Sequence, residues 1–130
     1  MPIPNKEFNT KEKGNIGEAI IISEFVKRGI PVSLPFGDNQ RYDLIAEFNG
    51  KLNKIQIKYS DQKEINHSIS IPTSSSYNHT TNKIRKKYNN DVDYIACYIK
   101  KWDRCCIIPI KEIGNRSNIC IRKEPTKHAK

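Results

Sequence analysis

The sequence predicts an α/β domain of the α+β kind, in which an N-terminal helix is followed by a mixed β-sheet with flanking helices. Three observations support this fold class. The chain has 130 residues, the length of one compact domain. Apolar residues recur at helical spacing over residues 13–28. Short apolar runs separated by turn signals fill most of the remaining chain, as expected for strands. Helix, strands, a polar insert and further strands, in that order, are typical of a helix–sheet sandwich.

The first predicted element is a helix over residues 13–28. Gly29 is expected to end it, because glycine readily adopts the left-handed conformation found after helix C-termini. Residues 1–10 are expected to form a loose polar lead-in. The apolar positions at helical spacing are Ile16, Ala19, Ile20, Ile22, Phe25 and Val26.

The predicted strands follow a short extended segment at 31–36. Asn49 and Gly50, a strong hairpin turn pair, separate strands at 43–48 and 52–59. Pro72 ends a strand at 68–71. Residues 73–90 are polar and basic, with a short helix expected over 82–88. The remaining expected segments are strands at 92–99, 105–110 and 118–122 and a basic tail at 123–130, all in one domain of residues 1–130.

The net charge of +9 is concentrated in the second part of the chain. Residues 1–78 carry 10 Lys and Arg against 9 Asp and Glu, whereas residues 79–130 carry 13 against 5. A balanced part that holds grouped carboxylates, joined to a basic part, suits an enzyme that acts on a polyanion. The alternative is a solvated basic surface that maintains solubility.

Hydropathy and cysteine usage indicate a soluble, intracellular protein without a membrane partner. No stretch approaches the roughly 20 apolar residues that span a bilayer, and the N-terminus lacks the apolar region of a signal peptide. None of the four cysteines forms a C-x-x-C pair. We therefore expect reduced, mostly buried thiols.

Turn geometry brings polar residues of the hairpin together. With Asn49 and Gly50 as a two-residue loop, counting outward puts Asp43 opposite Gln56, and Lys58 projects to the same face. A carboxylate, an amide and an ammonium group would then share one patch. A three-residue loop would shift this register. An Asp43–Lys58 ion pair on a solvated face is the alternative interpretation. The opposite face collects core residues: Leu44, Ala46, Phe48, Ile55 and Ile57.

Glu18 is the other carboxylate of interest. On a helical wheel it lies near Ile21, Ile22 and Phe25, where an unpaired charge is costly to bury. A partner for Glu18 is therefore expected. The alternative is that Asn15 and Glu18 form a capping box that marks the start of the helix.

Three short motifs in this order resemble the PD-(D/E)XK nuclease superfamily. They are Gly-Asn-Ile-Gly-Glu-Ala at 14–19, Tyr-Asp-Leu-Ile at 42–45 and Gln-Ile-Lys at 56–58. With Pro-Phe-Gly-Asp at 35–38, the set is most similar to group I intron-encoded homing endonucleases of the PD-(D/E)XK type. The resemblance implies a restriction-endonuclease-like fold. Tyr42 replaces the nominal proline, and Gln56 replaces an acid, which removes one negative charge from the metal site.

The resemblance also implies a role for each motif residue. Asp43 is the expected central ligand of Mg²⁺, which Mn²⁺ could replace, and Glu18 adds a second carboxylate. Gln56 offers its amide oxygen and Ile57 its backbone carbonyl. Lys58 orients the attacking water or stabilises charge on the phosphate. The implied reaction is in-line hydrolysis of double-stranded DNA that leaves 5′-phosphate and 3′-hydroxyl ends.

The polar insert is the expected site of target recognition. Its residues combine phosphate contacts with groups that read base edges, although a mobile surface loop is the alternative. One subunit has one site, so cutting both strands requires a homo-oligomer, a dimer or a tetramer. Two other functions remain open: a Holliday-junction-resolving or other structure-specific nuclease, and a non-catalytic basic nucleic-acid-binding module. The expected DNA contacts are Gln40, Arg41, Ser74, Ser75, Ser76, Tyr77, Asn78, Lys83, Arg85, Lys86 and Lys87.

Overall fold

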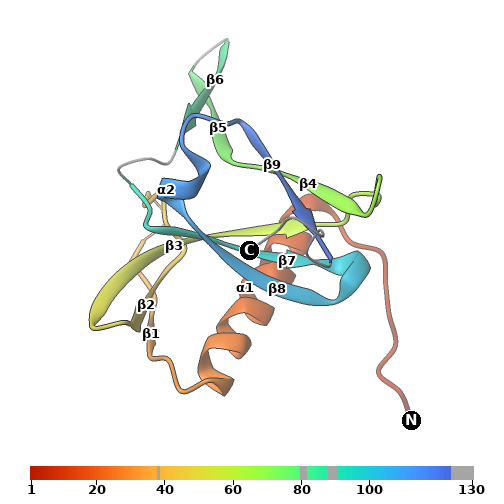
Figure 1. Ribbon diagram of the computed structural model, residues 1–130. Coiled ribbons are helices and arrows are strands. Elements are labelled where there is room, and N and C mark those ends of the chain that lie inside the picture. Colours follow the sequence, from red (N-terminus) through yellow and green to blue (C-terminus); the bar gives the residue numbers. More distant parts are fainter. Residues whose placement is uncertain (38, 80–81, 88–90, 124–130) are drawn as a thin grey trace.

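The computed structural model describes residues 1–37, 39–79, 82–87 and 91–123, and only the backbone of those between 74 and 90. Its elements form a layered α+β fold with one long helix against a five-stranded sheet (Figure 1). In chain order the elements are α1 (Thr10–Lys27), β1 (Val32–Ser33), β2 (Leu44–Phe48), β3 (Lys51–Ser60), β4 (Ser68–Pro72), β5 (Ser74–His79), β6 (Asn82–Lys87), β7 (Tyr94–Ile99), the 3₁₀ helix η1 (Lys100–Trp102), β8 (Arg104–Pro109), α2 (Ile110–Ile113) and β9 (Asn118–Arg122).

The central sheet is mixed, as predicted, in the order β1-β2-β3-β7-β8. Strands β3 and β7 run parallel, and every other neighbouring pair in this sheet is antiparallel. Asp93 fixes the start of the parallel pair. Its carboxylate accepts a hydrogen bond from the Lys54 N–H, and its own N–H donates to the Lys54 carbonyl, both at 2.8 Å. The chain between β3 and β7 contains β4, which pairs with β9, and also β5 and β6, which pair with each other.

Each face of the sheet buries its own hydrophobic cluster. The face toward α1 holds Ile21, Phe25, Leu44, Ala46, Ile55, Ile57 and Ala96. The other face lies under the β4–β9 ribbon and α2 (Figure 1) and holds Ile69, Ile71, Val92, Ile95, Cys97, Ile99, Ile113 and Ile119. Alternate residues of β3 therefore point to different layers, which is the geometry on which the catalytic prediction depends.

Helix α1 begins one turn earlier than predicted. Asn9 is the N-cap, and its side chain and that of Glu12 bond reciprocally to each other's backbone N–H groups in a capping box. The alternative box of Asn15 and Glu18 is therefore wrong, because both residues lie inside the helix. Gly29 follows the helix with φ +75°, and the bonds from Gly29 N–H to the Val26 carbonyl and from Ile30 N–H to the Phe25 carbonyl complete a Schellman motif. The predicted C-terminal stop is confirmed.

The apolar stripe of α1 differs from the predicted one. Its buried positions are Gly17, Ile21 and Phe25, each four residues after the last. Ala19 and Val26, which the spacing also included, are exposed. The helix carries apolar residues on more than one side, so spacing alone did not identify the side that faces the sheet.

The β2–β3 hairpin has the predicted turn. Asn49 and Gly50 have φ values of 55° and 72°, as a two-residue type I′ turn requires, and Phe48 pairs with Lys51. The buried Asn53 amide donates to the carbonyls of Ala46 and Phe48, each at 3.2 Å. These bonds stabilise the hairpin from within, so its register does not depend on the turn alone.

The short helix predicted over residues 82–88 is wrong. Asn82–Lys87 is instead β6, which pairs in antiparallel register with β5, so that Ser76 lies opposite Arg85. The two strands form a hairpin that projects beyond the sheet (Figure 1). Residues 82–87 contain one apolar residue, Ile84, and so have no stripe to pack as a helix. Pairing with β5 satisfies their backbone groups instead.

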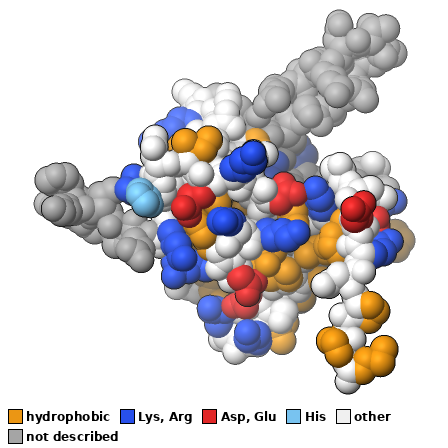
Figure 2. Space-filling view, turned by 90° about the vertical axis from the view of Figure 1, so that its right-hand side faces the viewer, with side chains coloured by type: hydrophobic (Ala, Val, Ile, Leu, Met, Phe, Trp, Pro, Cys, Tyr) orange, Lys and Arg blue, Asp and Glu red, His pale blue; other side chains and the backbone are white. Residues whose placement is uncertain are grey.

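The chain ends and cysteines give two further outcomes. Residues 1–9 form an extended lead-in that runs away from the body (Figures 1 and 2), with Met1 and Ile3 exposed. All four cysteines are free. Cys97 is buried, Cys105 and Cys106 are partly buried, and Cys120 is exposed. No helix in the described part of the chain is long and apolar enough to cross a membrane.

Candidate active site

Asp43 lies where β2 and β3 separate. The paired ladder ends at Leu44 and Ile55, one residue pair before the predicted pairing of Asp43 with Gln56. The Asp43 N–H donates to the Ile55 carbonyl at 2.8 Å, and Asp43 Oδ2 accepts the Ile57 N–H at 2.7 Å. Asp43 therefore bonds to both chain neighbours of Gln56. Its side chain takes a bond that a backbone carbonyl would receive if the ladder continued.

Gln56 and Lys58 project from the face of β3 opposite α1. They alternate with Ile55 and Ile57, which belong to the cluster under the helix. The Gln56 side-chain nitrogen donates to the Ile57 carbonyl oxygen at 3.5 Å. The amide oxygen of Gln56, which is the predicted ligand atom, does not take part in this contact. In the parallel register Lys58 lies beside Cys97. The Lys58 charge also acts on Asp43, where it lowers the carboxyl pKa.

The Asp43 carboxyl has a pKa above its ordinary value. Burial is the largest cause, since it penalises the charged form. The hydrogen bond from Ile57 N–H and the charge of Lys58 both oppose this effect but do not cancel it. A carboxylate in this environment gains from a nearby cation.

Glu18 reaches the site because α1 crosses β3 closely at Gly17. A Cβ atom on Gly17 would lie 3.2 Å from the Cβ of Tyr59, so a glycine allows the close approach. Glu18 follows and is partly buried. Its pKa is raised, first by burial and then by the charge of Asp43. The structure thus brings the two carboxylates within electrostatic range of each other, from α1 and from the start of β2.

A surface cavity of about 290 Å³ contains both carboxylates. It is lined by Glu18, Leu34, Pro35, Gly37, Gln40, Tyr42 and Asp43. Leu34 was not anticipated from the sequence, because one leucine in an extended segment carries no signal. Pro35, Gly37 and Tyr42 belong to motifs that carried the family resemblance, but their place beside the carboxylates comes from the structure.

These groups match the donor preference of a hard divalent cation. The carboxylates of Glu18 and Asp43 line the cavity, whereas the other two predicted ligands, Gln56 and Ile57, do not. All four would offer oxygen atoms, which Mg²⁺ prefers as ligands. In the part of the chain that the structure describes, no three His, Cys, Asp or Glu residues form a cluster able to hold a metal. The donor set is thus limited to two carboxylates, and their mutual repulsion would be relieved by a cation between them.

The expected DNA contacts fall into two groups. Gln40 is exposed and lines the cavity. Arg41 forms an ion pair with Asp91 at 2.6 Å, and only 21% of its side chain is exposed. The others lie on the β5–β6 hairpin, where the structure describes only the backbone, so the side chains of Ser74, Ser75, Ser76, Tyr77, Asn78, Lys83, Arg85, Lys86 and Lys87 lie outside the description.

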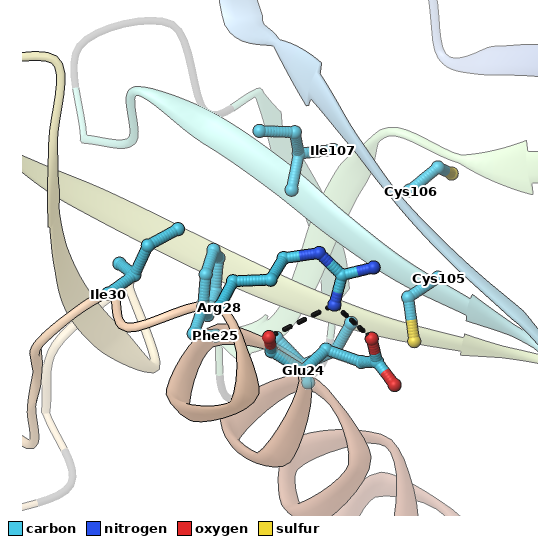
Figure 3. A pocket seen from close by; sticks show the side chains of 8 residues that line it. Glu24, Phe25, Arg28, Ile30, Cys105, Cys106 and Ile107 are labelled. Carbon is cyan, nitrogen blue, oxygen red and sulfur yellow. Dashed lines mark hydrogen bonds and ion pairs between the residues drawn. The ribbon is translucent and has the colours of Figure 1, made fainter.

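A second cavity, of about 180 Å³, lies between α1 and β8 (Figure 3). Glu24 is its one carboxylate, and it is ion-paired with Arg28. Cys105 also lines it, and burial raises the pKa of that thiol to about 11, so it is protonated at neutral pH. This cavity therefore lacks a combination of catalytic groups. Its lining consists of Ile21, Glu24, Phe25, Arg28, Ile30, Cys105, Cys106 and Ile107.

Charge on the described surface is mixed rather than uniformly basic. The face drawn in Figure 2 carries Lys and Arg side chains with Asp and Glu among them. At the ends of β3 and β7, Asp61 and Glu64 lie in a hollow with Lys63, Lys100 and Lys101. Asp61 is bonded to Lys13, and the Trp102 side chain donates to Glu64.

The motifs, the fold and the position of Asp43 agree with one family. The family model for PD-(D/E)XK endonucleases matches residues 8–130. The chain belongs to this family. Membership confirms the family resemblance and the fold class that the sequence predicted. The comparison with curated proteins found no match.

Two solved structures are similar to this PD-(D/E)XK chain. One is the bacterial homing endonuclease I-Ssp6803I, with 27% sequence identity and a TM-score of 0.77 over 95% of this chain and 84% of that chain. The other is Hjc, a Holliday junction resolvase from Archaeoglobus fulgidus, with 13% identity and a TM-score of 0.53 over 85% of this chain and 84% of that chain. At this identity the second likeness shows the fold alone.

Proposed function

We propose that the protein is a metal-dependent, site-specific endonuclease of the homing type that cuts double-stranded DNA. The observation that carries this proposal is the position of Asp43. Its carboxylate is bonded to β3 between Gln56 and Lys58. It also lies close enough to Glu18 that its charge adds to the effect of burial in raising the pKa of Glu18. A protein that only binds nucleic acid has no need to bury and crowd two carboxylates, which costs stability. Similarity to I-Ssp6803I favours the homing type.

In this proposal each side chain has a chemical role at the scissile phosphate. Lys58 donates to a non-bridging phosphate oxygen, where its charge stabilises the negative charge that develops during attack. The Ile57 N–H holds the Asp43 carboxylate in a fixed orientation. Leu34 and Pro35 supply apolar lining to the cavity. The products would carry 5′-phosphate and 3′-hydroxyl ends.

The metal would be held by Asp43, Glu18, the Gln56 amide oxygen and the Ile57 carbonyl. When bound, a Mg²⁺ ion supplies Lewis-acid polarisation of the phosphate and lowers the pKa of water. With Gln56 in place of an acid, the donor set carries two negative charges, so we expect weaker metal binding than a three-carboxylate site would give. Mn²⁺, with similar oxygen preference, is expected to substitute.

DNA binding is assigned to the basic second part of the chain. Lys83, Arg85 and Lys87 occupy alternate positions of β6, the strand that pairs with β5. A two-stranded ribbon fits the major groove of B-form DNA. Two copies of the chain would supply one catalytic site for each strand, and we propose a dimer or a tetramer.

A cleavage competition tests the proposal. A radiolabelled library of random linear duplexes and an immobile four-way junction are incubated together with the protein, once with Mg²⁺ and once with EDTA. Enrichment of one duplex site, on the order of 15–25 base pairs, that depends on Mg²⁺ is the expected result. Selective cutting of the junction would support a resolvase instead, since such an enzyme reads shape. DNA binding without any cutting would support the alternative function, a non-catalytic nucleic-acid-binding module.

A further inference from the structure

Phe36 is a fully exposed aromatic residue beside the catalytic cavity. Its relative exposure is 102%, so no part of the protein covers the phenyl ring. By contrast Phe25 is buried, and Phe48 packs against it with 6.3 Å between ring centroids. Both chain neighbours of Phe36, Pro35 and Gly37, line the cavity that holds Glu18 and Asp43. Phe36 itself is not among the lining residues, so the ring projects from the rim of that cavity into solvent.

The backbone around Phe36 suits this outward presentation. Gly37 has φ +88°, a conformation that is strained for side chains other than glycine, and Pro35 has a restricted φ. The chain turns at these two residues and holds the ring away from the core. Single exposed apolar residues are common on protein surfaces, so exposure alone assigns no role. The position between two cavity-lining residues is what distinguishes Phe36.

We propose that Phe36 inserts into the base stack of the DNA next to the scissile phosphate and holds that step partly unstacked. The inference rests on the proposed nuclease function. A phosphate placed in the cavity would put its flanking bases near the rim from which the ring projects. Apolar side chains, phenylalanine among them, are known to wedge between base steps and bend the duplex. The cavity itself carries the charges of Glu18 and Asp43, which repel a phosphate, and stacking supplies an attraction that does not depend on charge.

A second copy of the chain is the other conceivable occupant of this surface. An apolar groove of about 390 Å³ lies next to the site and shares Leu34 with the cavity. Phe36 itself lines neither of them, but both of its chain neighbours, Pro35 and Gly37, line the cavity and neither lines the groove. The observations therefore favour DNA. The groove is lined by Ile22, Val26, Gly29, Ile30, Pro31, Val32 and Leu34.

The test uses the full-length protein and the duplex enriched in the cleavage competition. 2-Aminopurine, whose fluorescence rises when it unstacks, is placed in turn at each step around the cut. Complexes are formed with Ca²⁺ to prevent cutting. The variants are Phe36→Ala, Phe36→Trp, which keeps an aromatic ring, and the control Leu52→Ala. Leu52 is also an exposed apolar residue, at 67%, but lies beside the hairpin turn rather than at the cavity.

Wild-type protein should raise the fluorescence at one step beside the cut. Phe36→Ala should remove that rise and weaken binding by about five- to a hundredfold, the range for one aromatic–base stack. Phe36→Trp and Leu52→Ala should behave as wild type. A mismatch at the same step should shrink the Phe36→Ala defect, because the step is already unstacked. A merely structural role for Phe36 would not produce this rescue.

Other outcomes overturn the proposal. Unchanged fluorescence and affinity in Phe36→Ala would do so, as would a lower oligomeric state of that variant in sedimentation, which would assign the ring to contact between copies. A wild-type protein that cuts no duplex would already refute the proposed function. That result is obtained before any Phe36 variant is made, so the two failures are distinguishable.

Discussion

The Ile57 backbone N–H donates a hydrogen bond of 2.7 Å to Oδ2 of Asp43. This bond joins the carboxylate to the strand that carries Gln56 and Lys58. Any displacement of β3 relative to β2 therefore moves the carboxylate, the amide and the ammonium group together. Asp43 is held by main-chain groups on two sides, and its orientation does not depend on a mobile side chain.

Asp43→Ala and Lys58→Ala should each abolish cleavage and leave DNA affinity within about threefold, because most affinity comes from phosphate contacts elsewhere. Single-turnover cleavage and filter binding measure the two quantities. Lys54→Ala is the control, since Lys54 lies on the same face of β3 four residues earlier. Full cleavage by a folded Asp43→Ala protein would contradict the catalytic assignment.

Gln56→Glu should leave Mg²⁺ affinity unchanged or raise it by up to about tenfold, because it adds a negative charge to an oxygen donor set. Isothermal titration calorimetry measures this affinity directly. Gln56→Leu, which removes the amide oxygen while keeping similar volume, should weaken it. If Gln56→Glu abolished Mg²⁺ binding, Gln56 would not be a ligand.

Asp43→Asn should stabilise the metal-free protein at neutral pH by about 0.5–2 kcal/mol. Since folding raises the pKa of Asp43 above its usual 3.8, the stability that this carboxyl contributes is present below pH 3.8 and is lost as the pH rises through the folded value. A permanently neutral amide avoids that loss. Urea denaturation in EDTA at pH 7.5 and at pH 4 should show a gain that shrinks on acidification.

Asp61→Asn provides the opposite case. The hydrogen bond from Lys13 lowers the pKa of Asp61, so this carboxylate contributes stability above its usual pKa that is lost on acidification. Its amide variant should be less stable than wild type at pH 7.5. Equal effects of Asp43→Asn and Asp61→Asn would refute the electrostatic account of the site.

Gly17→Ala should reduce cleavage by about tenfold while changing the free energy of unfolding by less than about 1 kcal/mol. The added methyl would lie 3.2 Å from Tyr59 Cβ, so α1 must shift and carry Glu18 with it. The greater helix propensity of alanine offsets the destabilising effect of the tighter contact on the free energy of unfolding. Gly14→Ala, on the same helix with nothing within 4 Å, should stabilise the protein and cut normally. Equal cleavage rates of Gly17→Ala and Gly14→Ala would show that cleavage does not depend on the position of Glu18.

The oligomeric state of the protein and the salt dependence of its DNA binding can both be measured directly. The protein should sediment as a dimer or a tetramer at micromolar concentration, and its affinity for DNA should fall at least tenfold between 50 and 200 mM salt, because basic residues displace counterions from DNA. Analytical ultracentrifugation and binding titrations at several salt concentrations measure both. A strict monomer that makes prompt double-strand breaks would oppose this prediction.

The local parts of the fold were predictable from the sequence. Asn49 and Gly50 determine their own turn, and the turn determines which residues of β2 and β3 are paired. The end of that ladder was not predictable, because it depends on Asp43 replacing a main-chain acceptor. The start of helix α1 was also ambiguous, because the sequence offers two capping patterns. Two Asn-x-x-Glu patterns stand six residues apart, and the helix begins at the first, where Lys13 of the added turn forms an ion pair with Asp61.

Non-local relationships account for the remaining differences. Ser74–His79 and Asn82–Lys87 have no apolar alternation, so their strand pairing was not visible in the sequence. The contribution of Leu34 to the cavity depends on where the segment after β1 passes α1. The approach of Glu18 to Asp43 was inferred only from motif order. It depends on the crossing of α1 and β3 at Gly17.

The parallel pairing of β3 with β7 has a consequence for the order in which the molecule assembles. Helix α1 and strands β2 and β3 all lie within residues 10–60, whereas β7 begins at Tyr94. The contacts among the first three are short in sequence and form fast, but the parallel pair must close a loop of more than thirty residues. On the ribosome the four proposed catalytic positions therefore emerge before β7, the parallel neighbour of β3. Slow docking of β7 should limit the folding rate, and substitutions of Ile95 should slow folding more than they speed unfolding.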